Sequence, residues 1–217
     1  MSRGIIIAGN ESNLLSAIET ETARRVEQYT LAAIPNRFIG IDAKPSSAAS
    51  LARIPLDWNP GSPITARTLI LAAENRLGCV DEAILVCDPP RTNRSINDIN
   101  LADVEILVHD HIKGWFFLAK ELAVFFKTKG EGTLALVYPE TGGNDDLLGA
   151  TALAAFRSFT RNLLSAVGSE PYLTLGFAGG ESGDEAGFAA FISKQLEERN
   201  PKAGGKLHKY GKASFFK

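Results

Sequence analysis

The 217-residue sequence has few cysteines, no long apolar run and no large excess of either charge. Its two cysteines, Cys79 and Cys87, are too few for a disulfide framework or a zinc site with four cysteine ligands. Both lie in or beside apolar segments, so we expect buried free thiols. No apolar stretch approaches the roughly 20 residues of a transmembrane helix, so no membrane span is expected. The formal net charge of -2 makes nucleic acid and anionic membrane surfaces unexpected partners.

The composition is that of an ordinary globular protein, with 45% hydrophobic and 22% charged residues. The first residues, MSRGIIIAGN, pass directly into a strand-like run and lack the long apolar region of a signal peptide. We therefore expect a cytoplasmic protein, and the length favours one domain over residues 1–217.

Short apolar runs alternate with longer segments of helical periodicity. Continuous apolar runs such as GIIIAG are typical of strands buried on both faces. The expected strands are 4–9, 30–34, 52–58, 82–87, 133–138, 172–177 and 206–212, and the expected helices are 13–26, 65–77, 101–128, 147–166 and 184–199.

This alternation predicts an α/β fold, a single doubly wound, Rossmann-like, mostly parallel sheet of seven strands with helices on both faces. Residues 40–63 are rich in Ser, Pro and Ala and predict a loop with a short helix. They are not a domain boundary, because strands on both sides belong to the same sheet.

Several segments occur in a recognisable order: RGIIIAGNESNLLSAI, IPLDW, DEAILVCDPP, HIKGWFFLAKEL, GTLALVYPE, ALAAFRSFTRNLLSA and, near the C-terminus, AAFISKQLEERNPKAGGKLHKYGK. In this order they resemble the short-chain dehydrogenase/reductase family over essentially the whole chain. The resemblance implies the family's fold and, for a typical member, NAD(P)-dependent oxidoreductase activity.

The family's phosphate-binding turn, TGxxxGxG, is only partly present. Gly9 matches, but Asn13 and Leu15 replace the next two glycines, and Glu11 adds a negative charge. A branched side chain at Leu15 and a carboxylate at Glu11 both oppose close approach of a pyrophosphate. The alternative is an ordinary strand-to-helix turn, with the helix capped by Asn10, Ser12 or Asn13.

Other positions of the cofactor site give mixed signals. By the resemblance, Arg37 would contact a 2'-phosphate and Asp57 the adenine edge, although both could be solvated surface charges. The family's Asn-Asn-Ala-Gly segment is replaced by Cys87-Asp88-Pro89-Pro90, whose prolines lack backbone donors. We expect no cofactor, or NADP if one binds.

The catalytic positions of the family are also changed. The alignment places Gly149 at the tyrosine and Leu153 at the lysine, and neither residue can transfer a proton. The serine position falls at Tyr138 or Pro139, and the asparagine of the proton relay matches His111. The helix over 147–166 keeps a packing face, for which we predict Leu148, Ala152, Ala155, Phe156, Phe159 and Leu163.

A rebuilt acid–base site from Tyr138, His111 and Glu140 is an alternative, because all three are predicted near the carboxyl ends of the strands. No metal is expected, since the neighbouring His109, Asp110 and His111 point in different directions on a helix.

Family members commonly associate through the helices that correspond to 101–128 and 147–166, and the aromatic residues of these helices predict a homodimer or homotetramer. The tail GKASFFK would suit a second seam. Three hypotheses follow: a non-catalytic subunit that pairs with itself or with an active paralogue, a divergent NADP-dependent oxidoreductase, and a small-molecule binder that uses the remodelled crevice.

Overall fold

Seven parallel strands form one sheet in the order β3-β2-β1-β4-β5-β6-β7 in a computed structural model, which describes residues 3–35, 37–38, 52–140, 146–179 and 183–211. The predicted fold class is confirmed. The strands are β1 (Ile5–Asn10), β2 (Tyr29–Ile34), β3 (Arg53–Pro55), β4 (Glu82–Val86), β5 (Thr133–Pro139), β6 (Leu173–Gly179) and β7 (Lys206–Lys209).

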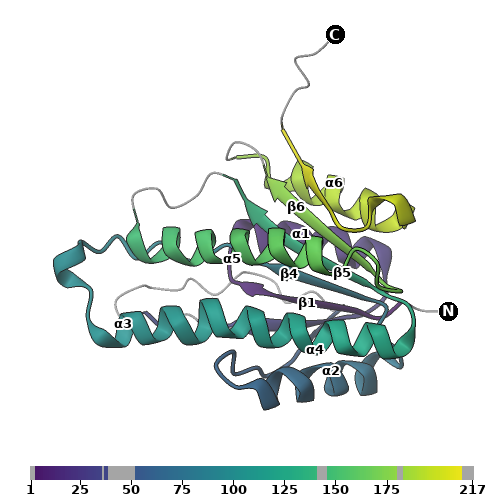
Figure 1. Cartoon of the computed structure of the whole chain (residues 1–217), viewed down its shortest axis with the longest axis horizontal. Coiled ribbons are helices and arrows are strands. Elements are labelled where there is room, and N and C mark those ends of the chain that lie inside the picture. Colours follow the sequence, from purple (N-terminus) through teal and green to yellow (C-terminus); the bar gives the residue numbers. More distant parts are fainter. Residues whose placement is uncertain (1–2, 36, 39–51, 141–145, 180–182, 212–217) are drawn as a thin grey trace, which may run out of the picture.

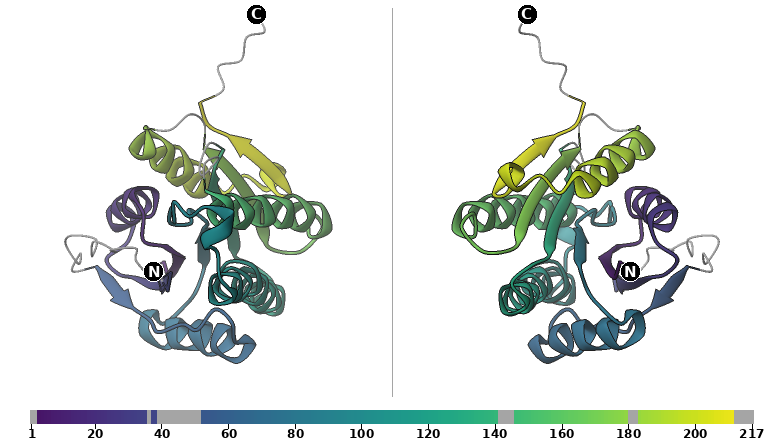
Figure 2. Two further views of the ribbon diagram at one scale, coloured as in Figure 1. Left: turned by 90° about the vertical axis from the view of Figure 1, so that its left-hand side faces the viewer. Right: turned by 90° about the vertical axis from the view of Figure 1, so that its right-hand side faces the viewer.

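Helices cover both faces of the sheet (Figures 1 and 2). One face carries α2 (Pro63–Leu77), α3 (Leu101–Ile106), the π-helical segment η2 (Leu107–Lys113), α4 (Gly114–Lys129) and α5 (Leu147–Ala166); the other carries α1 (Asn13–Arg25) and α6 (Glu185–Glu198). Short 3-10 turns lie at Ile96–Asp98 and Pro201–Ala203.

The apolar run of β1 supplies both layers of the core. All six of its residues are buried. Because alternate side chains point to opposite faces of a strand, Ile6 and Ala8 pack beneath α2 and α4, and Ile5 and Ile7 pack beneath α1 and α6. This two-sided burial explains why the strand sequence is continuously apolar.

A buried ion pair joins the two halves of the sheet at its amino edge. Glu82, the first residue of β4, is fully buried and accepts two hydrogen bonds from Arg25 at the end of α1, at 2.9 and 2.8 Å. Arg3 Nη1 lies 3.7 Å from the same carboxylate. The bidentate geometry compensates for the desolvation of Glu82.

Several predicted elements differ in the structure, among them the last strand, predicted over 206–212, which ends at Lys209. The third strand is shorter than predicted, because pairing with β2 ends at Pro55 and leaves Trp58 outside the strand as a core residue. The predicted helix over 101–128 is interrupted by the π-helical segment, which sequence periodicity did not indicate. Of the predicted loop over 40–63, residues 40–51 lie outside the described residues, and α2 already begins at Pro63.

The packing face of α5 is partly corrected. Leu148, Ala152 and Phe156 are buried as predicted. In contrast, Ala155, Phe159 and Leu163 are only partly buried, because they also line a groove beside α4, while Phe159 and Leu163 still pack against the core. The sheet-facing positions that the prediction missed are Gly149, Leu153, Thr160 and Leu164.

The two cysteines are free thiols, as expected, with Cys87 buried and Cys79 partly buried. Across the described ranges, no helix has the length and apolar character needed to cross a bilayer.

Candidate functional site

The candidate site lies at the carboxyl edge of the central strands. β1 ends at Asn10, β4 at Val86 and β5 at Pro139. The connections from β1 and from β4 run to opposite sides of the sheet, so the switch point lies between these two strands. Open α/β sheets bind ligands in the crevice outside such a point.

Gly9 is required by close packing of the protein itself. A Cβ atom at this position would lie 2.9 Å from the Val86 carbonyl oxygen and 3.0 Å from Leu15 Cδ1. Leu15 belongs to the first turn of α1, and its side chain is buried in the core between this helix and the sheet. Its side chain therefore fills the space beside Gly9, and the glycine is explained without a cofactor.

The N-terminus of α1 is occupied by protein groups. Ser12 is the N-cap, since its Oγ accepts a hydrogen bond from the Leu15 amide at 3.1 Å. The Asp88 carboxyl group, which follows β4, is close enough to Ser12 for the hydroxyl to affect its pKa. Burial raises the pKa of Asp88, and the negative charge of Glu185 raises it further. Ser12 and Arg91 lower the pKa of Asp88. A pyrophosphate at this terminus would meet acidic side chains.

Arg37, predicted as a contact for a 2'-phosphate, faces a protein carboxylate. Its Nε lies 3.5 Å from Asp110 Oδ2, and Asp110 is fully buried in η2. Burial raises the pKa of Asp110, whereas Arg37 and His109 lower it. Asp57, the predicted adenine contact, is an exposed residue just after β3.

The segment after β4 is joined by hydrogen bonds to the N-terminus of α5. Asp146, 2% exposed, caps α5 by accepting a hydrogen bond from the Gly149 amide at 3.2 Å. It also accepts hydrogen bonds from the Thr92 amide, at 2.9 Å, and from the Thr92 hydroxyl. Sequence reasoning missed Asp146, although an aspartate directly before a helical pattern is an N-cap signal.

Gly149 and Leu153, which align with the family's tyrosine and lysine, are both closely packed against other parts of the protein. A Cβ at Gly149 would lie 2.7 Å from Asp146 Oδ2 and 3.5 Å from the Pro90 carbonyl oxygen. Leu153 is 3% exposed and belongs to the apolar core on this face of the sheet. Both positions serve the packing of α5 against its neighbours.

Tyr138 is packed against α5. Its ring meets Phe156 edge-on at 6.2 Å between centroids, and Arg157 Cζ lies 5.6 Å from the ring centre. Burial raises the pKa of Tyr138, whereas the nearby Arg161 and Arg157 lower it. A raised pKa makes tyrosine a weaker proton donor at neutral pH.

The other two members of the predicted acid–base group have different neighbours. His111 is 2% exposed and stacks on Phe38, with 5.7 Å between ring centroids and 9° between planes. Burial lowers its pKa to about 4. Glu140 pairs instead with Lys209 of β7, at 2.8 Å. The three side chains therefore have different main contacts, with Glu140 near enough to Tyr138 to raise its pKa further.

His109, Asp110 and His111 diverge, as their adjacent positions predict. His109 lies against Gly61, Asp110 faces Arg37, and His111 faces Phe38. Among the residues with described positions, no group of three or more His, Cys, Asp or Glu side chains could hold a metal ion.

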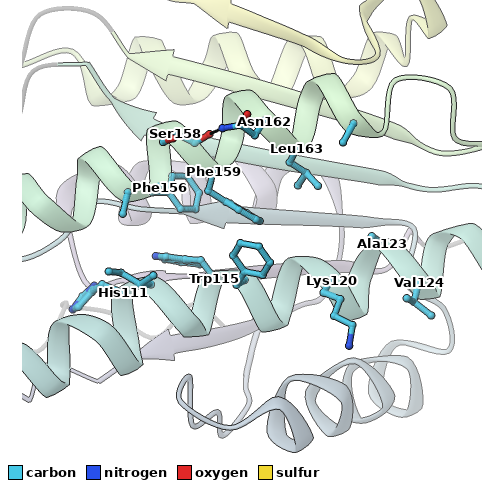
Figure 3. Close-up of a pocket in the computed structure, with 14 residues that line it drawn as sticks. His111, Trp115, Lys120, Ala123, Val124, Phe156, Ser158, Phe159, Asn162 and Leu163 are labelled. Carbon is cyan, nitrogen blue, oxygen red and sulfur yellow. Dashed lines mark hydrogen bonds between the residues drawn. The ribbon is translucent and has the colours of Figure 1, made fainter.

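A second concave feature lies between α4 and α5 on the outer surface (Figure 3). This α4–α5 groove has a volume of about 690 Å³ and an apolar lining with few polar groups. Phe116 and Val124, on the outward side of α4, are 58% and 54% exposed. The remaining lining residues are His111, Ile112, Trp115, Lys120, Ala123, Ala155, Phe156, Ser158, Phe159, Asn162, Leu163 and Ala166.

Solved structures of dehydrogenases match this fold over nearly the whole chain. An acetoin dehydrogenase from Enterobacter cloacae matches with a TM-score of 0.73 and 12% identity over 97% of this chain and 95% of that chain. A short-chain dehydrogenase/reductase from Brucella melitensis matches with a TM-score of 0.72 and 15% identity, covering 96% and 94%. The chain has the short-chain dehydrogenase/reductase fold.

A gluconate 5-dehydrogenase from Burkholderia cenocepacia, solved with NADP and tartrate, has a TM-score of 0.72 and 14% identity over 96% of this chain and 93% of that chain. No protein-family model and no curated protein sequence matches the chain. At these identities the likeness concerns the fold, and activity must be argued from the site.

The residues at the crevice do not fit a dinucleotide held in the way the resemblance implies. Leu15 lies against Gly9, the Asp88 carboxyl group is near the cap of α1, and Pro89 and Pro90 offer no amide donors. Arg37 is paired with Asp110. No reaction step through NAD(P) follows from this geometry.

Proposed function

We propose that this protein is a non-catalytic member of the short-chain dehydrogenase/reductase fold, acting as a structural or regulatory subunit that associates with itself or with an active paralogue. The observation that carries the proposal is the environment of the aligned tyrosine position. Gly149 has no ionisable group, and a larger residue would collide with the Asp146 carboxylate. The packing of the site therefore opposes a larger side chain, such as tyrosine, at this position.

The α4–α5 groove supports the self-association part of the proposal. Two large apolar side chains, Phe116 and Val124, lie eight residues apart on the same side of α4, beside an apolar hollow. A second copy related by a two-fold axis would cover both hollows with the same surfaces. We propose a homodimer or homotetramer that uses α4 and α5, and a cytoplasmic location consistent with two free cysteines.

The first test is calorimetric titration of the purified protein with NADPH and NADH, with light scattering on the same sample. We expect no heat of binding and an oligomer. Micromolar binding of either dinucleotide would contradict the proposal and favour an NADP-dependent oxidoreductase. Tyr138→Phe would then be the next variant, because NADPH-dependent turnover lost in it would assign an acid–base role to Tyr138.

The interface is tested with Phe116→Lys and Val124→Lys, which place a charge on the outward side of α4. Both should shift the scattering mass toward that of a monomer, since a charge buried at an interface is costly. Leu71→Lys is the matched control, because Leu71 is 48% exposed on α2 and lies outside the groove lining. An unchanged mass in both α4 variants would contradict this interface.

A further inference from the structure

The α4–α5 groove has a floor of aromatic rings from both helices (Figure 3). The rings of Phe116 and Phe159 lie 4.9 Å apart between centroids. Trp115 and Phe156, which are buried, lie 5.1 Å apart. α4 packs against α2 and α5 packs against η2, and the groove between α4 and α5 is open to the outer surface.

The volume and the lining of the groove suit an alkyl chain. About 690 Å³ lies within the roughly 300–1,000 Å³ of small-molecule sites. The helix rises about 12 Å from the η2 end of the groove to Lys120, at about 1.5 Å per residue. The apolar side chains that line this stretch come from both helices, and they are Ile112, Trp115, Phe116, Ala155, Phe156 and Phe159. An unbranched chain can therefore lie over the rings in contact with apolar groups on both sides.

Lys120 supplies the charge of the groove. Among the described residues of the lining it alone is charged at neutral pH, because burial lowers the pKa of His111 to about 4. The Lys120 side chain is 67% exposed, and its ammonium lies 3.7 Å from Glu121, a separation at which an exposed pair contributes little. The sequence of the facing helix, α5, contains no Asp or Glu. The charge of this rim therefore favours an anionic group and disfavours a cationic one.

We propose that the α4–α5 groove binds a free alkyl carboxylate, with its alkyl tail over the aromatic floor and its carboxylate beside Lys120. Figure 3 shows Lys120 reaching from α4 on the side away from α5, so its ammonium meets the head group at the outer rim and leaves the floor to the tail. Burial of the tail supplies most of the affinity, since each buried methylene group tightens binding by about fourfold.

This inference goes beyond the proposed subunit role and does not require the loss of catalysis. The groove is also part of the proposed self-association surface, so ligand binding and association are measured separately on the same samples. Titration with the ligand follows binding, and light scattering follows association.

The test is titration with octanoate, decanoate and dodecanoate below their micellar concentrations, followed by calorimetry and by the fluorescence of Trp115, which lines the groove. The dissociation constant should fall roughly tenfold for every two methylene groups added to the chain. Dodecyltrimethylammonium, which has the same tail and a cationic head, should bind the parent protein more weakly than dodecanoate does.

Two pairs of variants locate the tail and the head. Ala155→Phe places a ring in the groove and should weaken dodecanoate binding at least about tenfold. Ala154→Phe, at the exposed neighbouring position outside the lining, is its matched control and should bind as the parent does. Lys120→Met keeps an apolar stem and should weaken dodecanoate binding about threefold, without weakening binding of the cationic probe. Its control is Lys127→Met, because Lys127 lies on the same helix, outside the lining, and pairs with Glu170.

No binding of dodecanoate, or equal binding in Ala155→Phe and Ala154→Phe, would overturn the proposal. Equal affinity in Lys120→Met and Lys127→Met would refute the place of the head group. An oligomer that does not bind dodecanoate contradicts this inference alone, and a monomer that binds it contradicts self-association alone. If Ala155→Phe does not fold, the chain-length series and the two lysine variants still decide the question.

Discussion

Asp146 offers a direct test of how the site is held together. Its buried carboxylate accepts three hydrogen bonds, from the Gly149 amide and from the amide and hydroxyl of Thr92. Asp146→Ala removes the cap of α5 and leaves these donors without a partner. A lost N-cap costs about 1 kcal/mol and an unsatisfied buried donor about 1–3 kcal/mol. We expect a loss of about 3 kcal/mol in the free energy of unfolding.

The assay is urea denaturation followed by tryptophan fluorescence, since Trp58 and Trp115 are both buried on this face of the sheet. Asp146→Asn keeps one acceptor oxygen and should lose about half as much stability. Asp184→Ala is the matched control, because Asp184 caps α6 in the same way but at an exposed position. The reasoning would be refuted if Asp146→Ala destabilised the protein no more than Asp184→Ala.

Three further predictions concern the fold around the site. Gly9→Ala should lower the free energy of unfolding by about 1–3 kcal/mol in urea denaturation, because the new Cβ would meet the Val86 carbonyl; full stability would show that the backbone can move. Arg25→Ala should lower the free energy of unfolding by about 3 kcal/mol, because the Glu82 carboxylate stays buried without its bidentate partner. The double variant Arg25→Ala with Glu82→Gln should lose less, and the difference measures the coupling between Arg25 and Glu82. Because burial lowers the pKa of His111 to about 4, its neutral form stabilises the fold, fully above pH 6.5 and progressively less as the pH falls toward 4. Between pH 7 and pH 5, the parent should therefore lose about 2 kcal/mol more of its free energy of unfolding than His111→Gln does. Equal losses in the two proteins would contradict the assignment.

The fold could be predicted from the sequence because its signals are local. Continuous apolar runs such as that of β1 indicate strands buried on both faces, and the alternation with helices indicates parallel strands. Errors occurred where tertiary contacts decide. Pro55 ends the pairing of β3, and the π-helical turn at Leu107–Lys113 accommodates packing against α5 and the segment after β2.

The candidate site was predictable only in its residue types. The sequence shows that Gly149 and Leu153 cannot transfer protons, whatever the fold places around them. It did not show that Asp146 fills the space beside Gly149, or that Arg37 faces Asp110, because these partners are far apart in the chain. Tyr138 and His111 were predicted near the same edge, and the structure gives them different neighbours.

By itself, the sequence determined the strand and helix segments, the cap at Ser12 as one of three options, and the absence of ionisable groups at two aligned catalytic positions. These properties depend on side chains within one or two helical turns of each other. The tertiary structure alone decided that Leu15 fills the space beside Gly9 and that Phe38 covers His111. Packing and burial bring such residues together across the sheet, and the pattern of residues along the chain does not encode which of them meet.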